Sequence, residues 1–396
     1  MRRMKIVPDI RFKGFEDEWK LSELGRLFIE RIENNPNAEM LSVTINDGII
    51  KASENGRFDN SNSNKSKYKS VKKGDIAYNS MRMWQGASGV SNFEGIVSPA
   101  YTVLCPVSGV NSVFFSYLFK TIDTIKKFRL HSQGMTKDTW NLKYPALSKI
   151  AVEYPLEECQ QLQVASYLQN IDLQISKLVK RIVKLRQLKS ACLISMFPQQ
   201  GETVPRVRFK GFDGEWNEQK AEVIFRQFIE KNRPDLPVLS ATQDRGMVTR
   251  KAIGYDISHD KRNECTYKHI LPGQFVIHLR SFQGGFAHSD IEGIASPAYT
   301  VFEFRDKNQH NDIFWKYIFS SKSFIKQLEK ITYGIRDGRS ISFDEFKDMK
   351  FIIPCVKEQH QIASYFRNLD IQISEQEKRL EKLKQIKAAC LDKMFV

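Results

Sequence analysis

Several short stretches of the chain combine cationic and amide side chains with aromatic ones, and three such stretches occur in each half of the sequence. Arginine and lysine neutralise phosphate groups and can bond guanine, whereas glutamine and asparagine suit the edge of adenine. These stretches therefore predict contacts with double-stranded DNA. The residues concerned are Lys65, Lys67, Lys69, Asn79, Arg82, Trp84, Gln85, Gln133, Thr136 and Lys137 in the first half, and Lys251, Lys261, Arg262, His278, Arg280, Phe282, Gln283, Tyr333, Arg336 and Arg339 in the second.

The chain repeats much of its sequence once. Residues 94–103 return as 292–301, and residues 163–197 return as 361–395. The period is far longer than that of a solenoid repeat, so it indicates two domains on similar scaffolds.

The two copies differ where the DNA contacts are predicted. Arg82 and Arg280 are equivalent in the repeat, but Trp84 is replaced by Phe282. Shared anchor residues beside altered neighbours are what the recognition of two different base sequences would require. The repeat therefore predicts two similar frameworks with unlike reading surfaces.

The composition is basic, with 61 Lys and Arg against 46 Asp and Glu and a net charge of +15. Such an excess favours a polyanionic partner, and nucleic acid is the leading candidate. A basic protein without any such partner is the alternative.

The cellular location is indicated by features that the sequence lacks. No apolar signal-peptide core follows the basic start, and no stretch of about 18 apolar residues occurs. The six cysteines are scattered and form no C-x-x-C pair, as is usual for reduced thiols in the cytosol. We therefore expect a cytoplasmic protein with no membrane partner.

Catalytic motifs are not found in the sequence. It contains no phosphate-binding loop, no H-E-x-x-H and no Cys/His cluster at zinc spacing. Asp9 with Glu18 and Lys20 resembles the acidic pair and lysine of metal-dependent nucleases. In the second copy, however, Arg206 and Asn217 stand at the positions of Asp9 and Lys20, while the apolar frame persists. We therefore interpret this region as a packing motif and expect neither catalytic residues nor a metal site.

Two long helices with the same apolar period are the clearest predicted elements. Alternating spacings of three and four residues over several turns are typical of a coiled coil. We predict that the helices pair antiparallel; two separate helices, each packed on its own domain, are the alternative. At about 1.5 Å per residue, about 38 residues would form a rod of about 57 Å. The pairing positions are Leu168, Ile171, Ile175, Leu178, Ile182 and Leu185 in the first helix, and Phe366, Leu369, Ile373, Leu380 and Leu383 in the second.

The predicted fold is a tandem pair of α/β (α+β) domains separated by these helices. Short strand-like runs bounded by turn residues, followed by helical stretches near 113–128 and 313–331, indicate the mixed class. The predicted ranges are 1–155 for the first globular domain, 156–200 for the central helix, 201–353 for the second globular domain and 354–396 for the last helix.

Several repeated segments resemble those of one protein family. Each half opens with Phe-Lys-Gly-Phe followed by Glu-Trp, at residues 12–19 and 209–216. Residues 357–370 and the heptads after them have a weaker copy that starts at 158, and both copies run out with Met-Phe. Over essentially its whole length the chain resembles the specificity subunit of type I restriction-modification systems.

The resemblance implies separate roles for this chain and for its partner subunits. Each half would be a target-recognition domain for a few base pairs, and the helices would be the spacer between half-sites. Two modification subunits would dock on the chain, bind S-adenosylmethionine and methylate adenine. Restriction subunits would supply translocation and cleavage with ATP and Mg²⁺, so this chain itself would bind no cofactor.

The resemblance carries over no DNA-contact residue, because recognition domains of this family vary widely. Three other readings of the sequence remain open. They are a self-sufficient nuclease or methyltransferase fragment, a coiled-coil scaffold that binds proteins only, and an anti-restriction relative that keeps the fold.

Overall fold

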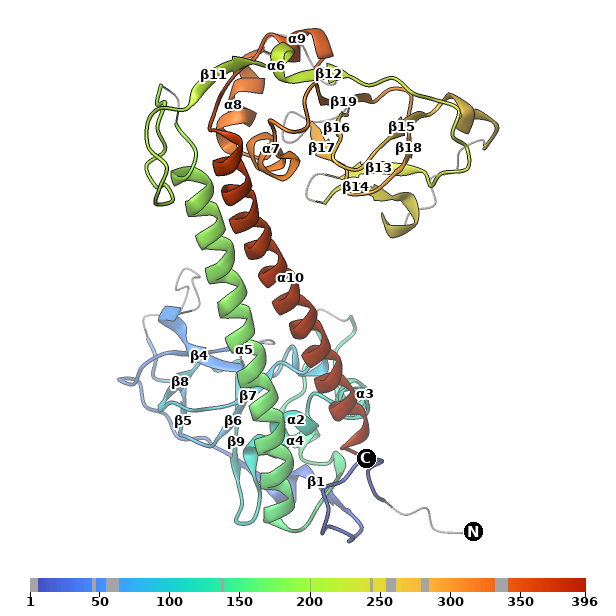
Figure 1. Ribbon diagram of the computed structural model, residues 1–396. Coiled ribbons are helices and arrows are strands. Elements are labelled where there is room, and N and C mark those ends of the chain that lie inside the picture. The colour runs from blue at the N-terminus through green and yellow to red at the C-terminus, as the bar shows by residue number, and fades with distance from the viewer. Residues whose placement is uncertain are drawn as a thin grey trace. The chain divides into compact units, whose positions relative to one another are not determined.

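The chain folds into two compact units, and the first of them is made from two separate parts of the sequence. The first unit joins residues 1–179 to 378–396, and the second holds residues 180–377. Both units include parts of the two long helices, α5 (Glu158–Ser195) and α10 (Val356–Lys393), of 38 residues each (Figure 1). The computed structural model describes residues 6–44, 48–54, 64–136, 139–199, 201–242, 245–253, 261–278, 285–331 and 341–396, with the backbone alone at 261–262 and 329–331.

The first unit is built around a four-stranded antiparallel sheet. Its strands, in spatial order, are β2 (Phe28–Glu30), β9 (Tyr101–Pro106), β6 (Ile76–Asn79) and β7 (Ser88–Val90). Three antiparallel pairs accompany it, namely β1 (Lys20–Glu23) with β10 (Ala151–Tyr154), β3 (Leu41–Thr44) with β4 (Gly48–Lys51), and β5 (Lys69–Val71) with β8 (Gly95–Val97). The short helices are α1 (Leu24–Leu27), η1 (Ala52–Glu54), η2 (Met83–Gln85), α2 (Ser112–Leu118), α3 (Ile122–His131) and α4 (Tyr144–Leu147).

The second unit repeats this topology strand for strand. Its four-stranded sheet has the order β12 (Phe225–Gln227), β19 (Thr300–Phe304), β16 (Phe275–Ile277) and β17 (Phe286–His288). The accompanying pairs are β11 (Asn217–Lys220) with β20 (Lys350–Ile353), β13 (Leu239–Thr242) with β14 (Gly246–Thr249), and β15 (Lys268–Ile270) with β18 (Gly293–Ala295). The helices are α6 (Ala221–Ile224), η4 (Arg250–Ile253), η5 (Lys261–Thr266), α7 (Asp312–Phe319), α8 (Lys322–Ile331) and α9 (Phe343–Lys347).

Both faces of each four-stranded sheet are buried. On β6, Ile76 and Tyr78 belong to the larger apolar cluster of the first unit, whereas Ala77 belongs to a smaller one. On β16, Phe275 and Val276 divide in the same way. Successive side chains of a strand point to opposite faces, so these short apolar runs form the centre of a layered domain.

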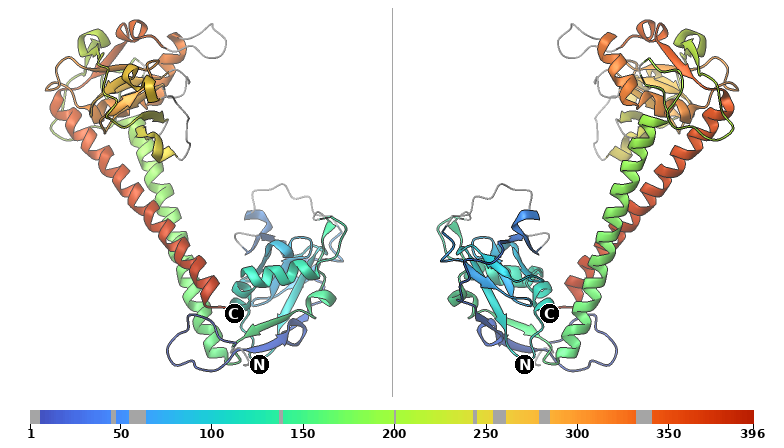
Figure 2. Two further views of the ribbon diagram at one scale, coloured as in Figure 1. Left: turned by 90° about the vertical axis from the view of Figure 1, so that its right-hand side faces the viewer. Right: turned by 90° about the vertical axis from the view of Figure 1, so that its left-hand side faces the viewer.

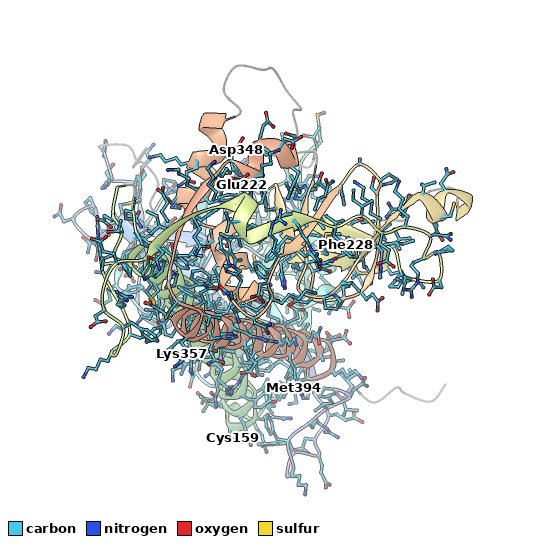
Figure 3. The ribbon with its side chains drawn as sticks, turned by 45° about the horizontal axis from the view of Figure 1, so that its top comes forward. Cys159, Glu222, Phe228, Asp348, Lys357 and Met394 are labelled. Atoms are coloured by element: carbon cyan, nitrogen blue, oxygen red, sulfur yellow. The ribbon has the colours of Figure 1, made fainter. Side chains whose placement is uncertain are left out.

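Each long helix ends in the core of the domain from which the other helix starts. Met394, labelled in Figure 3, and Phe395 follow α10 directly and join the large apolar cluster of the first unit. Met196 and Phe197 follow α5 in the same way and join that of the second unit. Figure 2 shows the C-terminus at the first unit, where the Ile10 amide donates to the carbonyl of the last helical residue, Lys393, at 2.9 Å.

The two long helices run antiparallel within each unit. Side-chain pairs connect them, and the residue number on α10 falls as the number on α5 rises. The pairs are Tyr167 with Cys390 and Asp172 with Lys387 in the first unit, and Arg186 with Glu377 and Lys189 with Asp370 in the second.

The apolar positions of the long helices are covered by domain residues as well as by the other helix. Leu168 and Ile171 belong to the same cluster as the domain residue Phe114. The two long helices therefore pair with each other and also pack on their own domains, two arrangements that we treated as alternatives. The fully buried positions are Leu168, Ile171, Leu178, Ile182, Phe366, Leu369 and Ile373, and the partly buried ones are Ile175, Leu185, Leu380 and Leu383.

A buried glutamine near the start of each long helix fastens that helix to its domain. Gln161 accepts from the Asn111 amide at 2.8 Å and donates to the Pro155 carbonyl at 2.9 Å. Gln359 makes the equivalent bonds, both of 3.0 Å, to Asn311 and Pro354. All polar atoms of such a buried amide need partners, so these bonds explain part of the repeated motif that the sequence shows here.

The predicted class of two tandem mixed domains with two long antiparallel helices is confirmed. One detail differs, because the helical stretches expected near 113–128 and 313–331 are each divided, the first into α2 and α3 and the second into α7 and α8. Thr121 caps α3 by accepting from the Thr124 amide, and Ser321 accepts from the Phe324 amide at the start of α8, so a new helix begins at each place. Among the residues that the structure describes, no helix combines the length and apolar character needed to cross a membrane.

Candidate nucleic-acid interface

Two of the stretches predicted to contact DNA meet in the first unit. The Leu142 amide donates to the Ser80 carbonyl at 2.9 Å, which joins the segment after β6 to the segment after α3. The rings of Trp84 and Trp140 meet edge to face, with centroids 5.4 Å apart. The guanidinium of Arg129 lies 5.8 Å from the centre of the Trp84 ring, within the range of a cation–π contact. We call residues 79–85, 129–136 and 139–141 together the first reading surface.

Some of the side chains predicted to contact DNA are exposed on the first reading surface, whereas others bond to the protein itself or are buried in it. Arg82 is exposed and so can reach a ligand. Asn79 accepts from the Met81 amide at 3.0 Å, and Trp84 donates to the Met81 carbonyl at 3.1 Å, so both hold the turn after β6. The Oε1 atom of Gln85 is buried and has no hydrogen-bond partner in the described part of the chain.

Hydrogen bonds join residues 133–136 to residues 139–141 at one edge of this surface. The backbones of Gln133 and Asn141 exchange two hydrogen bonds, of 3.0 and 2.8 Å. The Thr139 hydroxyl contacts both the amide and the carbonyl of Thr136, at 3.1 and 2.9 Å. Gln133 and Thr136 are both exposed, as predicted contacts should be. Lys137 lies outside the described residues.

Of the three lysines predicted in residues 65–69, Lys69 begins β5, and Lys65 and Lys67 precede that strand. Lys67 is exposed and Lys65 is half-buried. The ammonium group of Lys69 donates to Glu30 on β2 at 3.0 Å. Of the three, Lys67 is therefore the most available to a phosphate group.

The second unit places fewer of the predicted residues within the described part of the chain. His278 directly follows β16, and its ring centroid lies 6.2 Å from that of Tyr299. Lys251 lies exposed on η4. The side chains of Lys261 and Arg262 are not described, and the remaining predicted residues lie outside the described ranges. The latter are Arg280, Phe282, Gln283, Tyr333, Arg336 and Arg339.

Equivalent cations in the two units have different surroundings. Lys268 on β15 stands where β5 has Lys69, but it donates to the Tyr299 carbonyl instead of to a carboxylate. Burial, together with repulsion from Lys231, lowers the pKa of Lys268. Lys69 instead pairs with Glu30. The two domains therefore differ in local charge even where the strand topology is identical.

Three residues of these surfaces carry no signal in the sequence pattern that we used. Arg129 and Trp140 belong to the first reading surface, and Arg250 lies 5.9 Å from the ring centre of Tyr267 in the second unit. A search for cations at the ends of predicted helices would have found Arg129. No group of three His, Cys, Asp or Glu side chains in the described ranges could hold a metal ion.

The comparisons with known proteins agree with this architecture. Residues 218–385 match the family model of the type I restriction modification DNA specificity domain. The S subunit of a type I restriction-modification system from M. genitalium has a similar structure, with a TM-score of 0.58 and 14% identity, over 98% of this chain and 99% of that chain.

A second similar structure comes from work on complex assembly and conformational transition of the type I R-M system. Its TM-score is 0.50 and its identity 15%, over 95% of this chain and 97% of that chain. No curated protein matches the sequence. At these identities the structures establish the fold, while the family model identifies the second domain. Residues 218–385 are therefore similar to type I restriction modification DNA specificity domains, and the chain as a whole has the fold seen in a type I S subunit.

Proposed function

We propose that this chain is the sequence-specific DNA-binding subunit of a type I restriction-modification complex, and that it has no catalytic role of its own. Each unit would read one half of an asymmetric, bipartite DNA site. Two observations together carry the proposal. Both units have the same strand order, and the second unit matches a family of DNA specificity domains.

The asymmetry of the site follows from differences between the copies. Trp84 of the first reading surface corresponds to Phe282 in the sequence repeat. Lys69 and Lys268 also differ in their partners, a carboxylate in one unit and a carbonyl in the other. Similar frameworks with unlike contacts favour two different half-sites over a palindrome.

The long helices suit the role of a spacer. Each has 38 residues, which corresponds to about 57 Å of helix. Major-groove sites one turn apart are separated by about 34–36 Å, which such a helix pair can span. A stiff connection makes the second contact effectively intramolecular, so two weak domains would bind one site tightly.

Partner subunits would supply the chemistry. Two methyltransferase subunits would carry S-adenosylmethionine, and restriction subunits would use ATP and Mg²⁺. The outer faces of α5 support such docking, because Leu173 is 52% exposed in the first unit and Val183 is 46% exposed in the second. Apolar residues on a solvent face of a helix are common where another protein covers them.

A map of adenine methylation in cells with and without this chain tests the proposal. We expect one motif to lose methylation when the chain is deleted, and we expect that motif to have two unlike halves and a gap of constant length. An unchanged methylation map, or loss of a continuous palindrome, would contradict it. Complementation with the intact chain must restore the same motif.

A further inference from the structure

Met135 is the most exposed large apolar side chain in the described part of the protein. Its exposed fraction is 101%, against 83% for Leu130 and 78% for Ile32. The side chain therefore makes no contribution to the core, although Met135 lies two residues after Gln133 on the first reading surface.

The backbone next to Met135 is held in a defined place. Gly134, before it, has a φ of +147°, and a Cβ atom there would lie 2.6 Å from the Thr139 carbonyl oxygen. Only glycine fits such a position without displacing the backbone. The backbone of Gln133 is also paired with that of Asn141. Met135 thus follows a backbone position that the neighbouring residues fix.

The surroundings of Met135 are polar and cationic. Gln133 and Thr136 flank it and are exposed, and both could bond a base edge. Arg82 and Arg129 are exposed on the same surface. Leu130 and Met81 are the other exposed large apolar residues of this surface, and Met135 exceeds both in exposure. An apolar side chain flanked by hydrogen-bonding and cationic groups fits the major groove of DNA, because there the thymine methyl group is the apolar feature among polar base edges.

We infer that Met135 contacts the C5 methyl group of one thymine in the half-site that the first unit reads. This inference rests on the proposed function and adds one specificity-determining side chain to it. Met135 would distinguish thymine from cytosine and from uracil, neither of which carries this methyl group.

The test replaces single thymines by uracil in a duplex that carries the mapped site. Binding to the full-length chain in complex with its methyltransferase subunits is followed by fluorescence anisotropy. For the unmodified protein we expect one thymine whose replacement weakens binding about fourfold, the effect of about one buried methyl group. In Met135→Ala and Met135→Gln this difference should vanish at that position, and in Met135→Leu it should persist.

The control variant is Ile32→Ala, because Ile32 is also a highly exposed apolar residue of the first unit but lies outside the first reading surface. It should keep the fourfold difference. The inference is overturned if no thymine shows the effect, or if Met135→Ala keeps it. It is also overturned if Met135→Ala weakens assembly with the methyltransferase and leaves the thymine effect intact, which would indicate a protein contact. Absence of any preference of the unmodified complex for the mapped site would instead refute the proposed function.

Discussion

The hydroxyl group of Tyr117 donates a hydrogen bond of 2.7 Å to the carboxylate of Asp172, which joins α2 to α5. Lys387 of α10 pairs with the same carboxylate and lies 5.6 Å from the centre of the Tyr117 ring. A domain helix and both long helices thus meet at one polar cluster in the first unit. The second unit repeats the cluster with Tyr317, Asp370 and Lys189, in which the two long helices exchange roles.

Loss of the hydrogen bond between Tyr117 and Asp172 should measurably destabilise the protein. Burial, and then the bond to Asp172, raises the pKa of Tyr117, so the hydroxyl stays protonated and donates. Tyr117→Phe should lower the free energy of unfolding by about 1.5–3 kcal/mol, as for hydrogen bonds to charged groups. Denaturant unfolding of the full chain measures this.

A matched control for that variant is Tyr144→Phe. Tyr144 bonds to a neutral backbone carbonyl, that of Phe28, at 2.8 Å. Its loss should cost about 0.5–1.5 kcal/mol. A greater loss for Tyr144→Phe than for Tyr117→Phe would show that the carboxylate adds nothing.

The last residues of the chain should stabilise its first domain. Phe395 is buried, with its ring centroid 5.2 Å from that of Phe114 and 6.2 Å from that of Trp19. Phe395→Ala should destabilise the first unit by about 3–5 kcal/mol, because it leaves a cavity between aromatic rings. Hydrogen exchange should accelerate in β6 and leave β16 unchanged. Val396→Ala, at a partly exposed site, should change stability by less than about 0.5 kcal/mol. Equal acceleration in both strands would contradict the assignment of Phe395 to the first unit.

Acid should destabilise the second unit through His310. Burial lowers the pKa of His310, and Asp306 offsets this only in part. The unfolded chain then binds more protons than the folded chain as pH falls through the ordinary histidine range, so the contribution present at pH 7 is lost on acidification. His310→Gln and His310→Phe should both reduce the loss of stability between about pH 7 and pH 5. An unaltered pH profile in both variants would refute this role.

The spacer hypothesis predicts a change in the recognised gap. Insertion of seven residues into each of α5 and α10 would lengthen the pair by about 10 Å. At 3.4 Å per base pair this corresponds to about three base pairs. The methylation map should then show the same two half-sites with a wider gap. Altered half-sites would contradict the assignment of the helices as a spacer, and a loss of all methylation should be checked against a variant with one inserted residue in place of seven.

The fold class could be predicted because its signals are local or repeated. The spacing of the heptad positions from Leu168 to Leu185 by itself predicts a long helix. The sequence repeat predicts two domains with the same scaffold, and the strand topology of the two units agrees with this prediction. The division of the stretch near 113–128 into two helices was missed, because the capping role of Thr121 depends on a single hydrogen bond that apolar periodicity does not register.

The candidate site could be predicted only in part. Arg82 and Gln133 stand out by residue type and are exposed. Asn79 also stands out by type, yet its side chain holds a turn. Residue type states what a side chain can bond, but its surroundings decide whether it bonds the protein or a ligand.

The sequence by itself determined that this protein has two related domains, two long helices and a basic character, since composition, periodicity and repetition are properties of the chain alone. Only the tertiary structure decided that Phe395 completes a core around Trp19, and that Trp84 meets Trp140 to unite two stretches into one surface. These contacts join residues far apart in the chain. They form because burial of apolar surface stabilises contacts between any apolar side chains that the fold brings together, regardless of their separation along the sequence.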